Sequence, residues 1–408
     1  FRSLLKCVAA AEKLIFDTLK PHGYLPIDGI AAYDKAVQGL VFGAESAAVT
    51  GGRVATVQAL GGTGGLKVGG DFIKRVNPGV DLYISDPSWE NHRAIFEYAG
   101  YTVKTYPYYD AATNGLKFDA MMACFESLPA RTVVLLHACC HNPTGVDLNA
   151  AQWEKVIDVV KRRDLVPFLD IAYQGFADGL EEDAATIRRF TAECKAVFVS
   201  SSFSKSLSLY GERVGALSIV TSSKEEASRT LSQLKRVIRT NYSSPPTTGG
   251  QAVAMVLTTP ELRQQWDQEL GQMRERIKVM RKLLVEKIRA LRADFDFNFI
   301  IEQRGMFGPG RIAEGHALES DLAASGDTLL IDLWAREKNG GVYADQTWMA
   351  SMGAPSERVV TVWEAVRDAR DAALSLLQSR ITAGLPVRGG EADDAARAVI
   401  EARGFGPQ

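Results

Sequence analysis

The chain has 408 residues, of which 46% are hydrophobic, and its formal net charge is −2 at pH 7. A chain of this length can bury a large core in two or three domains, and its nearly neutral charge argues against a nucleic-acid partner. No apolar run approaches the roughly 18 residues that a membrane-spanning helix needs, so we expect no membrane insertion.

The cysteine count and the N-terminal residues give expectations about the cellular compartment and about whether the chain is complete. Five cysteines are odd in number and follow no disulfide framework, so we expect a reducing compartment and a cytoplasmic protein. The segment from Phe1 to Lys6 has the pattern of an amphipathic helix and not of a signal peptide. We therefore expect a chain that is truncated at its start.

Residues 1–306 alternate short apolar runs with helical patterns, which predicts an α/β fold with a mostly parallel sheet covered by helices. The expected strands are 54–60, 80–85, 102–106, 132–137, 166–170, 196–200 and 215–220. The expected helices are 64–76, 89–99, 149–163, 224–239, 249–257 and a long one over about 261–292. The long helix carries apolar residues at helical spacing, at Leu262, Trp266, Leu270, Met273, Ile277, Met280 and Leu284.

A change in composition divides the chain near Met306. Residues 307–408 carry ten basic and fifteen acidic residues, whereas residues 1–306 carry 37 basic and 34 acidic residues. Alanine also becomes more frequent after the break. The change predicts two domains, 1–306 and 307–408.

Lys205 is the most informative residue of the first domain. It ends the segment Ser-Ser-Ser-Phe-Ser-Lys (200–205), and Arg213 follows eight residues later. The lysine is expected on the loop at the C-terminal end of a strand, where open α/β sheets bind ligands. A lysine that forms a Schiff base needs a lowered pKa, and a phosphate beside it needs hydroxyl donors and an arginine. The alternative is a surface lysine in a serine-rich loop.

Two earlier motifs also follow expected strands. Gly61-Gly62-Thr63-Gly64 opens a helix, where backbone N–H groups and the Thr63 hydroxyl can bind an anion. A tight turn without a ligand is the alternative for this motif. Trp89 stands at a strand-to-helix turn and offers an indole face for stacking, with a core tryptophan as the alternative.

The segment His137-Ala-Cys-Cys-His-Asn-Pro-Thr-Gly145 clusters two histidines with Cys139 and Cys140. Its spacing lacks the paired elements of structural zinc sites, so we predict no metal there. Asp170 ends an apolar strand, and a buried carboxylate is costly unless a cationic group accompanies it.

Taken together and in this order, these motifs resemble the class I pyridoxal-phosphate aminotransferases, most closely the bacterial aspartate and aromatic-amino-acid branch. The resemblance extends over residues 1–306. It implies transfer of an amino group from an aromatic or acidic L-amino acid to 2-oxoglutarate, with pyridoxal phosphate held as a Schiff base on Lys205. The substrates would be an amino acid and a 2-oxo acid.

The resemblance also implies roles for individual residues. Around the cofactor phosphate it places Gly61, Gly62, Thr63, Ser202, Ser204 and Arg213. Around the cofactor ring it places Trp89, Asn142, Asp170 and Tyr173; Asn142 and Tyr173 face the ring oxygen and Asp170 the ring nitrogen. Trp89 and Asn142 would also contact the substrate, and Trp89 and Asp170 would act in catalysis with Lys205.

Two further residues match segments that reach the neighbouring subunit in this family. Tyr24 matches a catalytic tyrosine that crosses a dimer interface to the phosphate. Arg239 matches the arginine that binds the distal carboxylate of dicarboxylic substrates. We therefore expect a homodimer. Ser244 stands where aspartate-specific members usually have asparagine, which favours the aromatic-amino-acid enzymes.

The family pattern stops near Met306. The N-terminal arm and the end of the small domain have no counterpart, and Gly310-Arg311-Ile312 only superficially resembles the family's carboxylate-binding segment. We expect cofactor binding with turnover well below that of a complete enzyme. The segment 307–408 should not complete the small domain, and proteases should cut near 307–325.

Residues from about 311 to 408 resemble a different family, the pita-bread metallopeptidases that include prolidase and aminopeptidase P. Asp332 and Asp345 match the first two metal-binding aspartates, on strands expected to pair antiparallel. The other ligands of that family have no counterpart, so we predict no metal site and name these two only as weak candidates. We expect a partial α+β domain and a chimeric chain, with a peptidase fragment or an inactive remnant as the alternatives.

Overall fold

The computed structural model describes residues 5–18, 23–291, 296–305, 328–335, 344–351, 356–386 and 389–405. The chain forms two compact units, Phe1–Gly310 and Arg311–Gln408. The expected boundary at 306/307, the expected protease-sensitive junction and Arg311 lie outside the described residues. None of the described helices has the length and apolar character needed to cross a bilayer.

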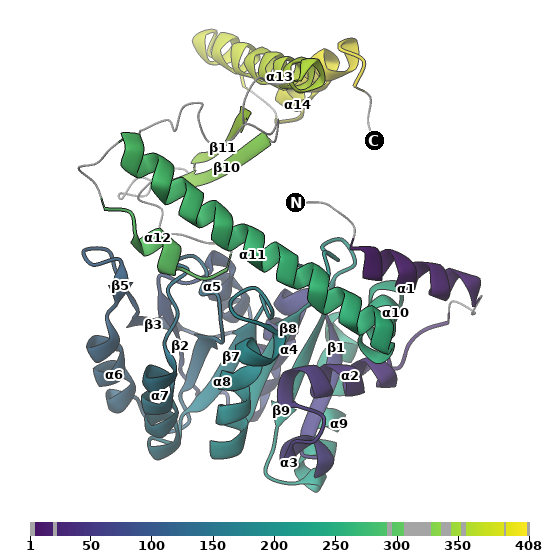
Figure 1. Cartoon of the computed structure of the whole chain (residues 1–408), viewed down its shortest axis with the longest axis vertical. Helices are drawn as coiled ribbons and strands as arrows, with labels where there is room; N and C mark the ends of the chain where they lie inside the picture. The colour runs from purple at the N-terminus through teal and green to yellow at the C-terminus, as the bar shows by residue number, and fades with distance from the viewer. Residues whose placement is uncertain are drawn as a thin grey trace. The chain divides into compact units, whose positions relative to one another are not determined.

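A seven-stranded sheet forms the centre of the first unit (Figure 1). Its strands are β1 (Val54–Leu60), β2 (Leu82–Asp86), β3 (Val103–Pro107), β6 (Val133–His137), β7 (Val166–Ile171), β8 (Val197–Ser202) and β9 (Val214–Val220). Their spatial order is β1-β9-β8-β7-β6-β2-β3. Each strand lies within two residues of its predicted bounds. A short hairpin of β4 (Tyr109–Asp110) and β5 (Gly115–Leu116) stands apart.

The sheet is mostly parallel, which confirms the predicted fold class. Strands β3, β2, β6, β7 and β8 pair in parallel, and β9 pairs antiparallel with both β8 and β1. All residues of β8 and β9 are buried, as expected of central strands that are covered on both faces.

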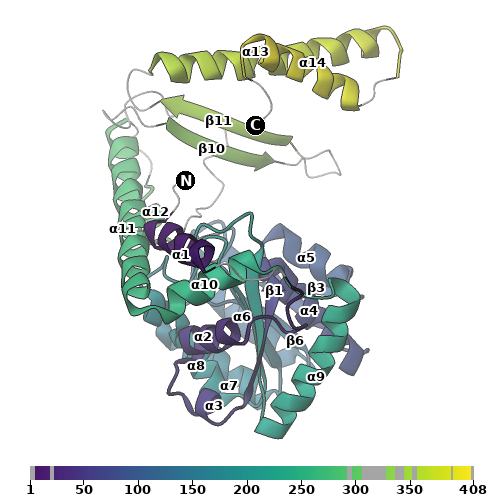
Figure 2. The same ribbon diagram turned by 90° about the vertical axis from the view of Figure 1, so that its right-hand side faces the viewer.

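Helices cover both faces of this sheet (Figures 1 and 2). The described helices of the first unit are α1 (Lys6–Asp17), α2 (Ala31–Phe42), α3 (Ala47–Thr50), α4 (Gly61–Val76), α5 (Glu90–Glu97), α6 (Phe118–Ser127), α7 (Ala150–Arg162), α8 (Leu180–Glu193), α9 (Lys224–Asn241), α10 (Thr248–Thr258), α11 (Pro260–Leu291) and α12 (Phe299–Glu302). Helices α2, α6 and α8 were not predicted. Three acidic residues, Glu181, Glu182 and Asp183, lie in the first turn of α8, a helix-start signal present in the sequence.

Two apolar clusters lie on opposite faces of the sheet. One contains side chains of α4, α5 and α9, and the other contains side chains of α2, α7, α8 and α11. Neighbouring residues of β7 divide between them, since Phe168 belongs to the first and Leu169 to the second. This alternation follows from the period of two residues along a strand.

The long helix α11 is buried along only part of its apolar stripe. Leu262, Trp266 and Leu270 are buried, whereas Met280 is exposed. The indole Nε1 of Trp266 donates to the carbonyl oxygen of Ser206 at 2.7 Å, which ties α11 to the loop after β8.

The second unit contains one strand pair and one helix pair among its described residues. Strands β10 (Thr328–Ala335) and β11 (Ala344–Ser351) pair antiparallel, as predicted, with Asp332 opposite Thr347 and Asp345 opposite Trp334. The side chains of Asp332 and Asp345 lie outside what the structure describes. Helices α13 (Glu357–Thr382) and α14 (Gly389–Ala402) pack together, and the Ser356 hydroxyl accepts from the N–H of Val359 at the start of α13.

Candidate active site

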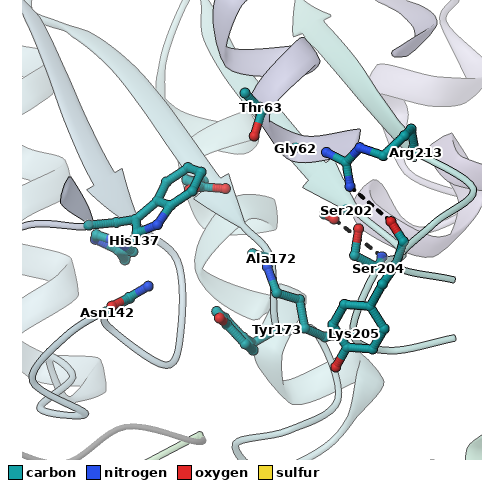
Figure 3. A pocket seen from close by; sticks show the side chains of 13 residues that line it. Gly62, Thr63, His137, Asn142, Ala172, Tyr173, Ser202, Ser204, Lys205 and Arg213 are labelled. Carbon is teal, nitrogen blue, oxygen red and sulfur yellow. Dashed lines mark hydrogen bonds between the residues drawn. The ribbon is translucent and has the colours of Figure 1, made fainter. Parts of the chain in front are cut away.

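A cavity of about 220 Å³ lies at the C-terminal ends of the central parallel strands of the first unit (Figure 3). Its lining consists of Gly62, Thr63, Trp89, His137, Asn142, Asp170, Ala172, Tyr173, Ser202, Ser204, Lys205, Tyr210 and Arg213. Ten of these residues were predicted to share one site. The other three, His137, Ala172 and Tyr210, were not predicted as site residues.

Strand topology explains why residues far apart in the sequence meet here. His137 ends β6, Asp170 is the penultimate residue of β7, and Ser202 ends β8. Because these three strands are parallel neighbours, their carboxyl ends share one edge of the sheet, where open α/β sheets bind ligands.

Glycines at the start of α4 form one wall of the cavity. Gly61 has a φ of +67°, and a Cβ there would lie 2.7 Å from Nη2 of Arg213. A Cβ on Gly62 would lie 3.2 Å from Cβ of Ser202. Glycine therefore allows this helix start to approach Arg213 and Ser202 closely, and it leaves backbone N–H groups facing the cavity.

Hydroxyl and guanidinium donors gather beside these glycines. The backbone N–H of Ser204 donates to the Ser202 hydroxyl at 3.3 Å, and Nη1 of Arg213 donates to the Tyr210 carbonyl oxygen at 3.1 Å (Figure 3). Thr63 adds another hydroxyl on the lining. This is the chemistry of an anion subsite, because Arg213 is the cationic group and the hydroxyls donate to oxygens.

Lys205 is half-buried in the same cavity. Its Nζ lies 4.9 Å from the centre of the Tyr173 ring. Burial lowers the pKa of Lys205, the nearby charge of Arg213 lowers it further, and Asp170 opposes the shift. A lysine with a lowered pKa has more of the neutral amine, which is the nucleophilic form.

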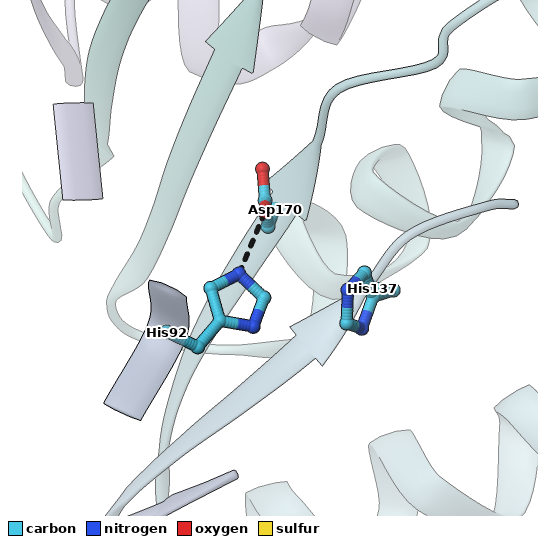
Figure 4. A group of neighbouring side chains, drawn as sticks. All are labelled: His92, His137 and Asp170. Atoms are coloured by element: carbon cyan, nitrogen blue, oxygen red, sulfur yellow. Dashed lines mark hydrogen bonds and ion pairs between the residues drawn. The ribbon is translucent and has the colours of Figure 1, made fainter. Parts of the chain in front are cut away.

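Asp170 is buried and has one oxygen without a partner. Its Oδ2 is 2.9 Å from Nε2 of His92 (Figure 4). Nδ1 of His92 is 2.9 Å from the Ser88 hydroxyl. Its Oδ1 has no hydrogen-bond partner in the structure. Burial by itself would raise the pKa of Asp170, but His92, His137 and Lys205 more than offset this and lower it. Asp170 is therefore an ionised carboxylate with a free acceptor oxygen.

His137 lies next to this pair, and the three side chains could in principle hold a metal ion. One ligand atom from each of His92, His137 and Asp170 lies within 4.8 Å of the others (Figure 4). Burial lowers the pKa of His137 to about 3, so this ring is neutral. The direct hydrogen bond between His92 and Asp170 accounts for their approach without a metal.

The turn that carries Asn142 is held by buried hydrogen bonds. Both ring nitrogens of His141 are used, one with Ser85 at 2.9 Å and one with Thr144 at 2.8 Å. The Asp147 carboxylate accepts from the N–H groups of Cys140 and His141 at 2.7 and 2.8 Å. These bonds fix the turn so that Asn142 lies on the cavity lining.

Trp89 and Tyr173 supply the aromatic surfaces of the site. Trp89 directly precedes α5, and its ring meets the His92 ring edge-on, with centres 5.1 Å apart. Tyr173 is buried in the loop after β7. Both rings line the cavity together with Asp170 and Asn142, and aromatic faces suit stacking with a flat ligand.

Tyr24 and Arg239 do not line the cavity. The Tyr24 side chain is 99% exposed in the segment before α2. Arg239, near the end of α9, is exposed, and its guanidinium donates to the Ser243 hydroxyl. Within one subunit the structure therefore leaves both residues outside the site. Gly61 adjoins the lining through its contact with Arg213.

Comparison with known proteins gives two family matches. Residues 2–325 match the family described as aminotransferase class I and II, and residues 309–408 match metallopeptidase family M24. The chain is 60% identical to an aspartate aminotransferase of Pseudomonas aeruginosa over 304 residues, which are 74% of this chain and 76% of that protein. It is 50% identical to a tyrosine aminotransferase of Klebsiella pneumoniae over 306 residues, which are 74% of this chain and 77% of that protein.

A solved structure matches the first unit as well. The aromatic-amino-acid aminotransferase of Burkholderia pseudomallei, covalently bound to pyridoxal phosphate, has a TM-score of 0.74 and 62% identity, over 75% of this chain and 77% of that one. The two resemblances predicted from motifs are thereby confirmed.

Proposed function

Because the chain belongs to the class I and II aminotransferases, we propose that it transfers the amino group of an aromatic or acidic L-amino acid to 2-oxoglutarate, with the cofactor attached to Lys205. The chain is an aminotransferase, and its cofactor is pyridoxal phosphate. When bound, this cofactor acts as an electron sink for negative charge at the substrate Cα.

The observation that carries the proposal is the buried Asp170 in the same cavity as Lys205. Its Oδ1 is a buried acceptor without a partner, and it belongs to an ionised carboxylate. A protonated ring nitrogen would satisfy this oxygen and supply the positive charge that a buried carboxylate needs. The donor set at the other end of the cavity, with Arg213, Ser202 and Thr63, suits a phosphate. The lining therefore fits pyridoxal phosphate at both ends.

The remaining residues would orient the ring and move a proton. Trp89 would cover one face of the ring, and Asn142 and Tyr173 would donate to its oxygen. The Lys205 amine, with its lowered pKa, would move a proton between the substrate Cα and the cofactor carbon. His92 and Ser88 would keep Asp170 in position.

We propose a homodimer in which the partner subunit completes each site. The supporting observation is that Tyr24 and Arg239 are exposed and outside the cavity of their own subunit. Tyr24 would reach the phosphate of the partner subunit, and Arg239 would bind the distal carboxylate of the substrate there. The five free cysteines support a reducing compartment such as the cytoplasm.

Borohydride reduction of the cofactor-loaded chain tests the attachment. We expect one covalent label, which peptide mapping locates at Lys205, and no label in Lys205→Ala. Lys195→Ala is the matched control, because Lys195 is exposed just before β8, at the opposite end of that strand. Labelling of Lys205→Ala to the parental extent would refute the proposal.

Mixing two inactive variants tests the shared site. Lys205→Ala and Arg239→Ala should each lose transfer of amino groups from aspartate. A mixture that exchanges subunits should regain about a quarter of parental activity, because half of the dimers would contain one intact site. No recovery in a mixture proven to contain hybrid dimers would refute the intersubunit role of Arg239.

A further inference from the structure

A second cavity of about 200 Å³ lies in the first unit, apart from the cofactor cavity. Three segments form it: the loop after β7, the middle of α11, and α12 with the residues that follow it. It shares no lining residue with the cofactor cavity. Helices α11 and α12 contact each other beside it (Figure 1).

Positive charge dominates this lining. Five cationic side chains contribute to it, and only two carboxylates do. The cationic residues are Arg274, Lys278, Arg281, Lys282 and Arg304. One of the two carboxylates, Asp178, forms an ion pair with Arg304, so it does not neutralise the others.

The inner cationic groups contact neutral oxygens. Nη1 of Arg274 donates to the Gly175 carbonyl oxygen at 2.7 Å, and its Nε is buried without a hydrogen-bond partner. Arg281 donates to the carbonyl oxygens of Ile300 and Gly305 at 2.8 and 2.9 Å. Burial lowers the pKa of Arg281, which reflects the cost of removing its charge from water.

Gln303 adds a buried donor to the same wall. Its side chain is only 6% exposed, and Nε2 has no hydrogen-bond partner. Buried donors normally have partners, so the unpartnered nitrogens of Gln303 and Arg274 indicate a site that lacks an acceptor. Lys278 and Lys282 are exposed on the same lining and add two ammonium groups, of which that of Lys278 pairs with Glu275 at 3.2 Å.

We propose that this cavity binds a small dianion, with carboxylate or phosphate oxygens as the recognised chemistry. Arginine forks and ammonium groups are the donors that such oxygens prefer. The volume is below the roughly 300–1,000 Å³ of pockets for drug-sized ligands, which limits the ligand to a few heavy atoms. The site is independent of the proposed aminotransferase activity.

The cavity adjoins both loops that carry cofactor-site residues. Its Phe176–Asp178 wall continues the loop of Tyr173, and the N–H of Arg304 donates to the carbonyl oxygen of Gly145, three residues after Asn142, at 2.8 Å. A bound anion would contact the loop that holds Tyr173, and Arg304 would link it to the loop that holds Asn142.

Calorimetric titration of the cofactor-loaded full chain tests the proposal. The cofactor is first fixed by borohydride, so that the phosphate subsite beside Arg213 is filled. The probes are inorganic phosphate and succinate, and the tighter of the two identifies the preferred source of the anionic oxygens. We expect saturable binding of one anion per chain, weakened by high salt.

The double variant Lys278→Gln/Lys282→Gln should weaken this binding at least tenfold, because it removes two charged donors. Both side chains are exposed, so the variant should fold normally. Lys287→Gln is the matched control, since Lys287 lies on the same helix but outside the cavity lining, and it should bind like the parent. Absence of binding by both anions in the parent, or equal affinity in parent and double variant, would overturn the proposal.

Discussion

The two compact units differ in how they bury side chains. In the first unit a seven-stranded sheet carries an apolar cluster on each face, and its largest fully buried side chain is Trp266. In the second unit the described side chains of α13 that are buried are Ala365 and Ala369, while Trp363 is 48% exposed. A central sheet allows helices to pack on both of its faces, whereas a helix pair buries only one stripe on each helix.

The difference extends to ionisable groups. In the first unit Asp170 is buried and His137 and Asp34 are partly buried, and each has a shifted pKa. In the described part of the second unit, the shifted groups are surface arginines such as Arg367 and Arg397, whose pKa values are raised by hydrogen bonds to neighbouring aspartates. A site that requires desolvated charges can therefore form in the first unit.

The largest expected effect is on the free energy of unfolding, and it is tested by replacing one tryptophan in each unit. Trp266→Ala should lower the free energy of unfolding by about 3–5 kcal/mol, because it leaves a cavity and an unpaired Ser206 carbonyl. Trp363→Ala should change it by no more than about 0.5 kcal/mol, since Trp363 is 48% exposed and lies outside any buried cluster of the described residues. Equilibrium unfolding in urea, followed by circular dichroism, measures both. Equal losses would show that the packing of the two units does not differ in this way.

Asp170→Asn tests whether the reaction requires the negative charge of this buried side chain. Asparagine keeps the shape but cannot balance a ring cation, so kcat/KM should fall by about a hundred- to a thousandfold. Steady-state transamination with aspartate and 2-oxoglutarate is the measurement. Asp164→Asn is the control, because Asp164 is exposed just before β7 and should remain at the parental rate. A parental rate for Asp170→Asn would exclude the charge of this residue from the reaction.

Asp34→Asn tests the cost of a buried carboxyl group away from the site. The pKa of Asp34 is raised to about 9, mainly by burial and then by the charge of Asp28, while Lys235 opposes the shift. Between the ordinary pKa near 4 and about 9, the folded state retains a proton that the unfolded state releases. Stability should therefore fall as pH rises in this window, by at most about 1.4 kcal/mol per pH unit.

Asparagine cannot ionise, so the stability of Asp34→Asn relative to the parent should increase from pH 5 to pH 8. Urea unfolding at several pH values measures this. Asp158→Asn is the control for the loss of an exposed carboxylate, since the Asp158 side chain is 70% exposed. A constant difference for Asp34→Asn would mean that the carboxyl ionises normally in the folded chain.

For removal of metal from the protein we expect no effect. Removal of metal by prolonged dialysis against a chelator should leave covalent cofactor labelling and urea unfolding unchanged, because hydrogen bonding explains the approach of His92 and Asp170. Loss of labelling that zinc restores would instead assign a metal to His92, His137 and Asp170.

The local sequence was sufficient to predict much of the site. Each motif stands at the end of an apolar run, so the pattern alone places Thr63, Asn142, Asp170 and Lys205 at strand ends. Their meeting in one cavity follows from parallel pairing, which the alternation of strands and helices predicted. Helices α2, α6 and α8 were not predicted from the sequence, and neither was the position of His137 next to Asp170.

The sequence by itself determined the family, the fold class of the first unit and most of the residues that line its cavity, because short motifs and periodic apolar patterns encode local geometry. Only the tertiary structure decided which groups are desolvated and which lack partners. The unpaired Oδ1 of Asp170, the neutral ring of His137 and the cationic cavity beside α11 all depend on segments that are distant in sequence. Burial and electrostatic shifts arise from the sum of such neighbours, and no single stretch of sequence specifies that sum.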